Sequence, residues 1–86
     1  MKRIEFYIGI LSIDKHSLYS YIKGINSILS EEHQVEILGE FDDPYGYYEL
    51  ICKGSWHSYD HFNVHNGPSY IKSLQHYEEE NYDHIN

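Results

Sequence analysis

Histidines recur at every fourth position in one short segment of the chain, at His57, His61 and His65. A spacing of four places side chains on one face of either a helix or a strand. On a helix, two imidazoles at this spacing lie about 6 Å apart and could share one zinc ion. On a strand they stand roughly 13 Å apart and could not. His57 and His61 are therefore candidate zinc ligands only in a helix, where Asp60 or a distant histidine would have to complete the shell.

Tyrosines and carboxylates mix in a second group around residues 40–49. The group comprises Glu40, Asp42, Asp43, Tyr45, Tyr47 and Glu49. A small core cannot hold all ten tyrosines of the chain, whose hydroxyls need partners when buried. Rigid aromatic anchors beside carboxylates are typical of a surface that binds a basic protein. A second acidic run, Glu78, Glu79 and Glu80, could extend this partner-binding surface. Two plainer interpretations stay open: the aromatic side chains fill the sheet face under the helices, or they bury a homodimer interface.

Other catalytic patterns have little support. Cys52 shares the parity of Tyr48 and Leu50 in an extended segment, where a small buried side chain belongs. No oxyanion-loop motif accompanies it, and no glycine-rich phosphate loop is present. Carboxylates are plentiful, but nothing in their spacing specifies an acid–base pair. We therefore expect no enzymatic activity and no cofactor, with zinc as the alternative cofactor.

The charge balance excludes whole classes of partner. Acidic residues number 14 against 6 basic ones, which gives a net charge of −8. No lysine or arginine occurs between Gly24 and Cys52, where many of the acids fall. Such a surface repels phosphate backbones and anionic membranes, so we expect no direct binding of nucleic acid or membrane. A basic protein would instead be attracted, although a merely solvated surface is the plain alternative.

The N-terminal segment loosely imitates a signal peptide, because Lys2 and Arg3 precede an apolar run from Ile4 to Ile13. Glu5 interrupts that run, and no small-residue cleavage site follows it. No apolar stretch approaches the roughly 20 residues of a membrane-spanning helix. We expect a cytoplasmic protein. The single cysteine excludes an internal disulfide framework, and 86 residues fit one domain over 1–86.

Hydrophobic periodicity predicts the first half of the fold. Apolar side chains alternate from Ile4 to Leu11, which predicts a strand. A helix follows at about 14–32, with Asp14 as its N-cap and Ile13 packed on Leu18 as a hydrophobic staple. Its apolar stripe comprises Leu18, Ile22, Ile25 and Leu29. A second alternating segment, the turn Asp42–Gly46 and a third segment at Tyr47–Lys53 then predict a β-hairpin.

The second half is less distinct. Residues 55–65 favour a further strand, because Trp56, Phe62 and Val64 share parity, while a helix capped by Ser55 remains the alternative. Gly67-Pro68 suits the start of a final helix that runs to about residue 81. The expected fold class is α+β: a small antiparallel sheet of three or four strands with two helices on one face, in the order β-α-β-β-(β)-α.

Three functional hypotheses follow. The first is a small acidic intracellular inhibitor that occludes a basic protein by placing carboxylates where that protein expects phosphates. Its target would be a nuclease toxin, for an immunity protein or antitoxin, or a host nucleic-acid-handling enzyme, for a mobile-element anti-defence protein. The second is a metal- or small-molecule-binding module that uses the His/Tyr face of residues 57–65. The third is a small enzyme with a His/carboxylate site. We favour the inhibitor.

Overall fold

Four antiparallel strands form one sheet in the order β2-β3-β1-β4. They are β1 (Ile4–Leu11), β2 (Glu36–Asp42), β3 (Tyr47–Gly54) and β4 (Ile71–Tyr77). The computed structural model describes residues 3–62 and 68–77. The α+β class with an antiparallel sheet is confirmed, and β1 lies in the interior of the sheet, between β3 and β4.

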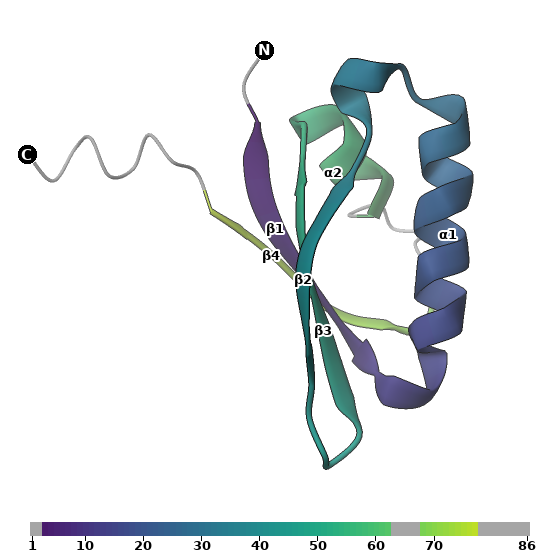
Figure 1. The fold of residues 1–86 in the computed structure, drawn as a ribbon, viewed down its shortest axis with the longest axis vertical. Coiled ribbons are helices and arrows are strands. Elements are labelled where there is room, and N and C mark those ends of the chain that lie inside the picture. Colours follow the sequence, from purple (N-terminus) through teal and green to yellow (C-terminus); the bar gives the residue numbers. More distant parts are fainter. Residues whose placement is uncertain (1–2, 63–67, 78–86) are drawn as a thin grey trace, which may run out of the picture.

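Two helices, α1 (Lys15–Ile28) and α2 (Trp56–Phe62), accompany the sheet, with short 3-10 turns η1 (Ser12–Asp14) and η2 (Glu31–His33) at either end of α1 (Figure 1). Both helices contribute to the same hydrophobic cluster on one face of the sheet. In the described ranges, no helix has both the length and the apolar character needed to cross a membrane.

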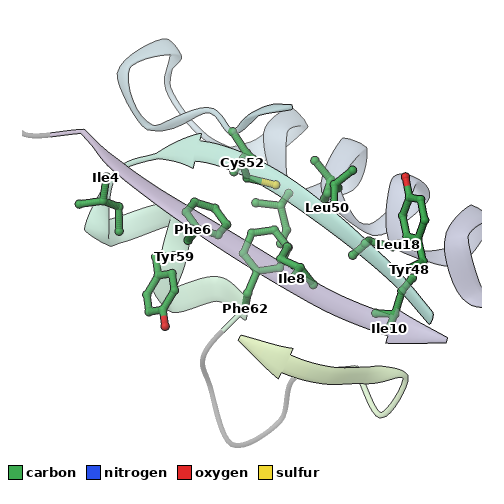
Figure 2. Packing of buried hydrophobic residues seen from close by; sticks show 13 residues of the cluster. Ile4, Phe6, Ile8, Ile10, Leu18, Tyr48, Leu50, Cys52, Tyr59 and Phe62 are labelled. Carbon is green, nitrogen blue, oxygen red and sulfur yellow. The ribbon is translucent and has the colours of Figure 1, made fainter. Parts of the chain in front are cut away.

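The core lies between this face and the helices (Figure 2). The alternating residues of β1 supply its centre and are fully buried: Ile4, Phe6, Ile8 and Ile10. The α1 stripe supplies Leu18, Ile22 and Ile25, as predicted. Buried Cys52 fills a core position as a small apolar residue, also as predicted, and burial raises the pKa of its thiol to about 12.

The ends of α1 differ from the prediction. Asp14 occupies the N-cap position, but its carboxylate makes no capping hydrogen bond. Ile13 is 88% exposed, so it forms no hydrophobic staple with Leu18. The helix ends at Ile28 rather than near residue 32. Asn26 helps to explain the early stop, because its side chain pairs with both backbone groups of Val35, at 2.8 and 3.0 Å, and ties the helix end to the start of β2.

The β2–β3 hairpin is confirmed, with Asp42 opposite Tyr48 as its last strand pair. The turn uses the chemistry expected of it: Gly46 has a positive φ of 98°, and Asp43 Oδ1 accepts the Tyr45 amide at 2.8 Å. The Ser12 amide donates to the Gly46 carbonyl at 2.6 Å, which fastens the turn to the end of β1.

The strand preferred for residues 55–65 is wrong over Trp56–Phe62, where the helical alternative is correct. Ser55 and Ser58 cap this helix reciprocally: the Ser58 amide donates to Ser55 Oγ at 3.2 Å, and the Ser55 amide donates to Ser58 Oγ at 2.9 Å. Tyr59 and Phe62, three residues apart, both contact Phe6 of the core. In so short a segment, the spacing of Tyr59 and Phe62 predicts a helix as well as the shared parity of Trp56 and Phe62 predicts a strand. Packing on Phe6 favours the helix.

The final helix is also wrong, because Ile71–Tyr77 forms β4, paired with the free side of β1. Pro68 begins a turn, in which its carbonyl accepts the Ile71 amide at 3.1 Å, instead of a helix. The apolar spacing fitted a helix, but pairing of this segment with β1 satisfies the backbone groups of a buried central strand. The last two elements are therefore α2 and then β4. Residues 63–67 and the acidic run 78–80 lie outside the described residues.

The sheet face opposite the helices carries a contact that spans three strands. Tyr47 of β3 crosses over Gly9 of β1, and its hydroxyl lies 3.1 Å from Ser73 Oγ of β4. A Cβ atom at Gly9 would lie 1.9 Å from the Tyr47 hydroxyl oxygen and 2.2 Å from Ser73 Oγ. Glycine is therefore required here by close approach rather than by backbone conformation.

We predict that Gly9→Ala lowers the free energy of unfolding by about 1–3 kcal/mol, because the new methyl group displaces Tyr47. Urea denaturation measures this change. In a Tyr47→Ala/Ser73→Ala background most of the cost should disappear, since both side chains that a Cβ at Gly9 would meet are then shortened. Equal costs in both backgrounds would show that Gly9 does not accommodate Tyr47 and Ser73.

Candidate functional site

The pleat of the hairpin divides the predicted partner-binding residues between the two faces of the sheet. Glu40 pairs with Leu50 and Asp42 with Tyr48, and both partners are buried under the helices. Glu40 and Asp42 therefore lie on the helix side, at the sheet edge. Glu49 pairs with Phe41 on the opposite face. The structure thus presents two separate groups instead of one continuous surface.

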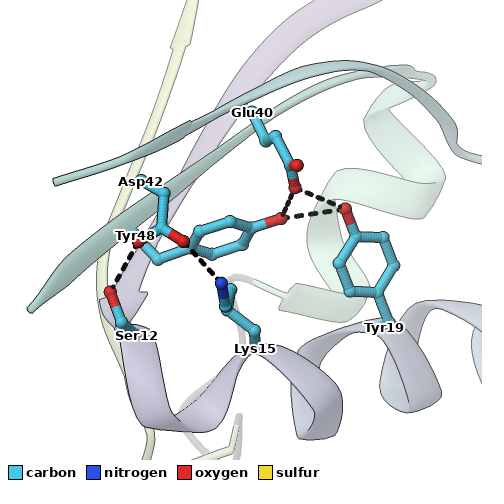
Figure 3. A network of polar contacts seen from close by, with 6 residues as sticks. All are labelled: Ser12, Lys15, Tyr19, Glu40, Asp42 and Tyr48. Atoms are coloured by element: carbon cyan, nitrogen blue, oxygen red, sulfur yellow. Dashed lines mark hydrogen bonds and ion pairs between the residues drawn. The ribbon is translucent and has the colours of Figure 1, made fainter.

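Glu40 is held by two tyrosines (Figure 3). Its Oε2 accepts a hydrogen bond from the Tyr48 hydroxyl and another, at 2.9 Å, from the Tyr19 hydroxyl. The two hydroxyl oxygens lie 2.8 Å apart. Tyr48 comes from the buried face of β3 and Tyr19 from α1, so this triangle joins the helix to both strands of the hairpin.

Asp42 is held by Lys15 and Ser12, which lie at the junction of β1 and α1 (Figure 3). Lys15 Nζ lies 2.5 Å from Asp42 Oδ2, and Ser12 Oγ donates to Oδ1 at 3.0 Å. The Lys15 ammonium also lies 5.3 Å from the centre of the Tyr48 ring, within range of a cation–π contact. Asp42 and Glu40 are thus linked through Tyr48, because the Lys15 ammonium that pairs with Asp42 lies near the Tyr48 ring and the Tyr48 hydroxyl donates to Glu40.

Hydrogen bonds and burial together shift the pKa values of the titrating groups of this network away from neutral pH. The hydrogen bonds from Tyr48 and Tyr19 lower the pKa of Glu40, and those from Lys15 and Ser12 lower the pKa of Asp42. The hydrogen bond to Asp42 raises the pKa of Lys15. Burial, and then the hydrogen bonds to Glu40 and Tyr19, raise the pKa of Tyr48. Near pH 7 the carboxylates and the ammonium stay charged and the phenol stays neutral.

These directions decide what the network can do chemically. A general acid or base works best when its pKa lies near the operating pH. A carboxylate with a lowered pKa is a weak base, and a lysine with a raised pKa is a poor nucleophile. The network is therefore suited to holding fixed charges in place, and its geometry gives no support to acid–base catalysis.

The second group lies on the sheet face that neither helix covers. We call it the open-face patch and define it by Leu11, Phe41, Tyr47 and Glu49, which belong to the end of β1 and to the strands of the hairpin. Phe41 is 56% exposed, Leu11 45% and Tyr45 94%. Tyr47 is half-buried by its contact with Ser73. The hairpin turn that carries Tyr45 lies at one extreme of the molecule's long axis (Figure 1).

The histidines lie elsewhere. His57 and His61 occupy one turn of α2, with ring centres 5.3 Å apart, so the helical condition for a shared metal is met. His33 approaches from η2, with its ring centre 4.7 Å from that of His57. Within residues 3–62 and 68–77, however, no three His, Cys, Asp or Glu side chains are arranged to hold a metal ion. His65 is not among the described residues.

Sequence reasoning missed Lys15, Tyr19 and Tyr48 as partners of the hairpin carboxylates. A partial signal was present, because Lys15 and Tyr19 lie four apart on a helix while Glu40 and Asp42 lie two apart on a strand. Each spacing places its pair on one face. Which helical face meets which strand face depends on tertiary packing and cannot be read from spacing.

The chain matches no protein-family model, no curated protein sequence and no solved structure. Any function must therefore be inferred from the chain's own geometry.

We predict that acid destabilises the fold through Glu40 and Asp42. Both pKa values are lower in the folded state, so the unfolded chain binds more protons as the pH falls. The stabilisation is complete above the unfolded-state values, roughly 4.3 for glutamate and 3.9 for aspartate, and is lost as the pH falls through the native values. The free energy of unfolding, measured in urea from about pH 6 to about pH 3, should fall less steeply for Glu40→Gln than for the wild type.

Glu31→Gln is the matched control, because the exposed side chain of Glu31 has no hydrogen-bond partner in the described part of the chain. Its curve should follow that of the wild type. If Glu40→Gln also follows the wild type at every pH, the tyrosine hydrogen bonds do not stabilise the carboxylate.

Proposed function

We propose that this chain is a small acidic inhibitor that binds one basic protein through the open-face patch and the adjoining hairpin turn. The observation that carries the proposal is the uncovered sheet face, on which exposed apolar side chains adjoin carboxylates. Both helices pack on the other face, so in the described part of the chain these side chains meet no packing layer. Contiguous exposed apolar surface rimmed by polar groups is typical of protein-binding sites.

The patch has the composition of a binding hot spot. Phe41 and Tyr47 of the patch are aromatic, as is Tyr45 in the adjoining turn, and aromatic anchors dominate the energetics of protein interfaces. Tyr47 is already fixed by Ser73, so little side-chain entropy remains to be lost when a partner docks. The patch therefore supplies rigid contact area on strands rather than on a mobile loop.

The charge supports a basic partner. Glu49 lies on the patch and Asp43 in the adjoining turn, whereas the ammonium of Lys15 is already paired with Asp42. The net charge of −8 would accelerate encounter with a positively charged protein and would make binding sensitive to salt. Carboxylates on a small rigid surface can occupy positions where a nucleic-acid-handling protein holds phosphates.

Occlusion of this kind fits the work of an immunity protein or antitoxin against a nuclease toxin, or of a mobile-element protein against a host nucleic-acid-handling enzyme. In each case one inhibitor molecule covers one target. A second copy of the chain is the competing occupant of the same patch, and the experiment below separates the two.

The first experiment is capture on the tagged chain from its host at low salt, with elution at about 0.5 M salt, where charge attraction is screened. We expect one basic protein, and its affinity for variants of the patch then tests the site. Phe41→Thr combined with Glu49→Lys should weaken binding at least about tenfold, since it removes an aromatic anchor and reverses a charge.

Glu31→Lys makes a charge reversal of the same size at an exposed site on η2, far from the hairpin turn along β2. It should change the affinity much less than the patch variant does. Equal losses in the two variants would mean that net charge alone drives binding. Recovery of the chain as a dimer that the patch variant dissociates would instead assign the patch to self-association.

A further inference from the structure

β2 is the outermost strand of the sheet in the described part of the chain, with β3 on one side. An edge strand presents backbone amide and carbonyl groups that another strand can pair with, and proteins usually block such edges with lysine, proline or a bulge. β2 contains neither lysine nor proline. Its one irregularity lies between Ile37 and Gly39, so the stretch Gly39–Asp42 keeps a regular register with β3.

The side chains of this regular stretch alternate in chemical character as well as in direction. Glu40 and Asp42 lie on the helix side, and Phe41 between them lies on the open face. All three are exposed. A strand added alongside β2 would place its own side chains over these in the same alternation. The residues that would complement Glu40, Phe41 and Asp42 are, in order, a basic residue, an apolar residue and a second basic residue.

The two carboxylates are already ordered. Glu40 is fixed by Tyr19 and Tyr48, and Asp42 by Lys15 and Ser12. A partner's basic side chain would therefore meet carboxylates whose positions do not have to be fixed on binding, which reduces the entropic cost. Glu40 carries its full charge, because Tyr19 and Tyr48 are neutral, whereas Lys15 offsets part of the charge of Asp42. Phe41, by contrast, is a large exposed apolar side chain in position to cover the middle residue of the incoming strand.

We propose that an extended segment of a basic protein adds to β2 as a fifth strand, with two basic side chains over Glu40 and Asp42 and an apolar side chain over Phe41. This inference rests on the proposed function, because a basic partner is its premise. The mode of recognition is strand addition. The added strand would adjoin the open-face patch, because Phe41 belongs both to β2 and to that patch.

Charge also selects against a second copy of the chain at this edge. Two β2 strands side by side would bring Glu36 and Glu40 of both copies to one shared edge, and β2 has no lysine or arginine to offset these charges, although Lys15 offsets that of Asp42. Like charges across neighbouring strands are destabilising. A basic segment removes that repulsion and replaces it with attraction.

The test uses the full chain and a synthetic probe: a peptide of about seven residues, matching β2 in length, in which lysine and valine alternate. Amide chemical shifts are recorded by NMR at low salt. We expect saturable shifts at Gly39–Asp42 and an affinity that falls at least about tenfold when alternate backbone nitrogens of the peptide are methylated, because methylation removes the donors that pair with an edge. A peptide of the same composition with consecutive lysines should bind more weakly.

The second part of the test measures binding of the peptide to variants of the chain. Glu40→Gln and Asp42→Asn should each weaken the alternating peptide, while Glu31→Gln should not. Equal binding of the methylated peptide, shifts confined to other strands, or no binding at all would each overturn strand addition. Concentration-dependent shifts of β2 without peptide would overturn it in favour of self-pairing. The proposed function fails separately, if the partner's affinity does not respond to the Phe41→Thr/Glu49→Lys patch variant.

Discussion

Burial of one face of β1 is the constraint on which the rest of the structure depends. Ile4, Phe6, Ile8 and Ile10 form a row of fully buried side chains, and α1 and α2 cover them from one side of the sheet. Pairing with β3 on one side and β4 on the other satisfies the backbone of this central strand. In the part of the chain that the structure describes, neither helix lies on the opposite sheet face, so the position of the open-face patch follows from the way the core is built.

The same constraint explains why the acidic and aromatic side chains of the hairpin are divided between the two faces of the sheet. A hairpin at the edge of a one-sided sheet sends alternate side chains toward the helices and toward the uncovered face. Glu40 and Asp42 meet α1 and its N-terminal junction, where they are fixed, while Phe41 and Glu49 remain on the uncovered face. One short segment thereby both anchors the helix and presents a surface.

Local patterns predicted the elements in which one periodicity was dominant. The alternation in β1, the stripe of α1 and the Pro-Tyr-Gly turn each admit one interpretation, and each is confirmed. The segments at 56–62 and 71–77 carry apolar residues that fit either period, and contacts with Phe6 and β1 decide them. The site shows the same limit. The acidic and aromatic residues were visible in sequence, but the pairing of Lys15 with Asp42, 27 residues apart, is a product of tertiary packing.

The choice of partners for the two fixed carboxylates has an electrostatic consequence. Lys15 orders Asp42 and at the same time offsets its charge. Tyr19 and Tyr48 order Glu40 with neutral hydroxyls, and their raised pKa values keep them neutral near pH 7. Tyrosine can therefore hold an anion in a defined position without cancelling it. In a chain with 14 acidic and 6 basic residues, this allows a carboxylate to be rigid and still fully negative, which is what electrostatic recognition of a basic partner requires.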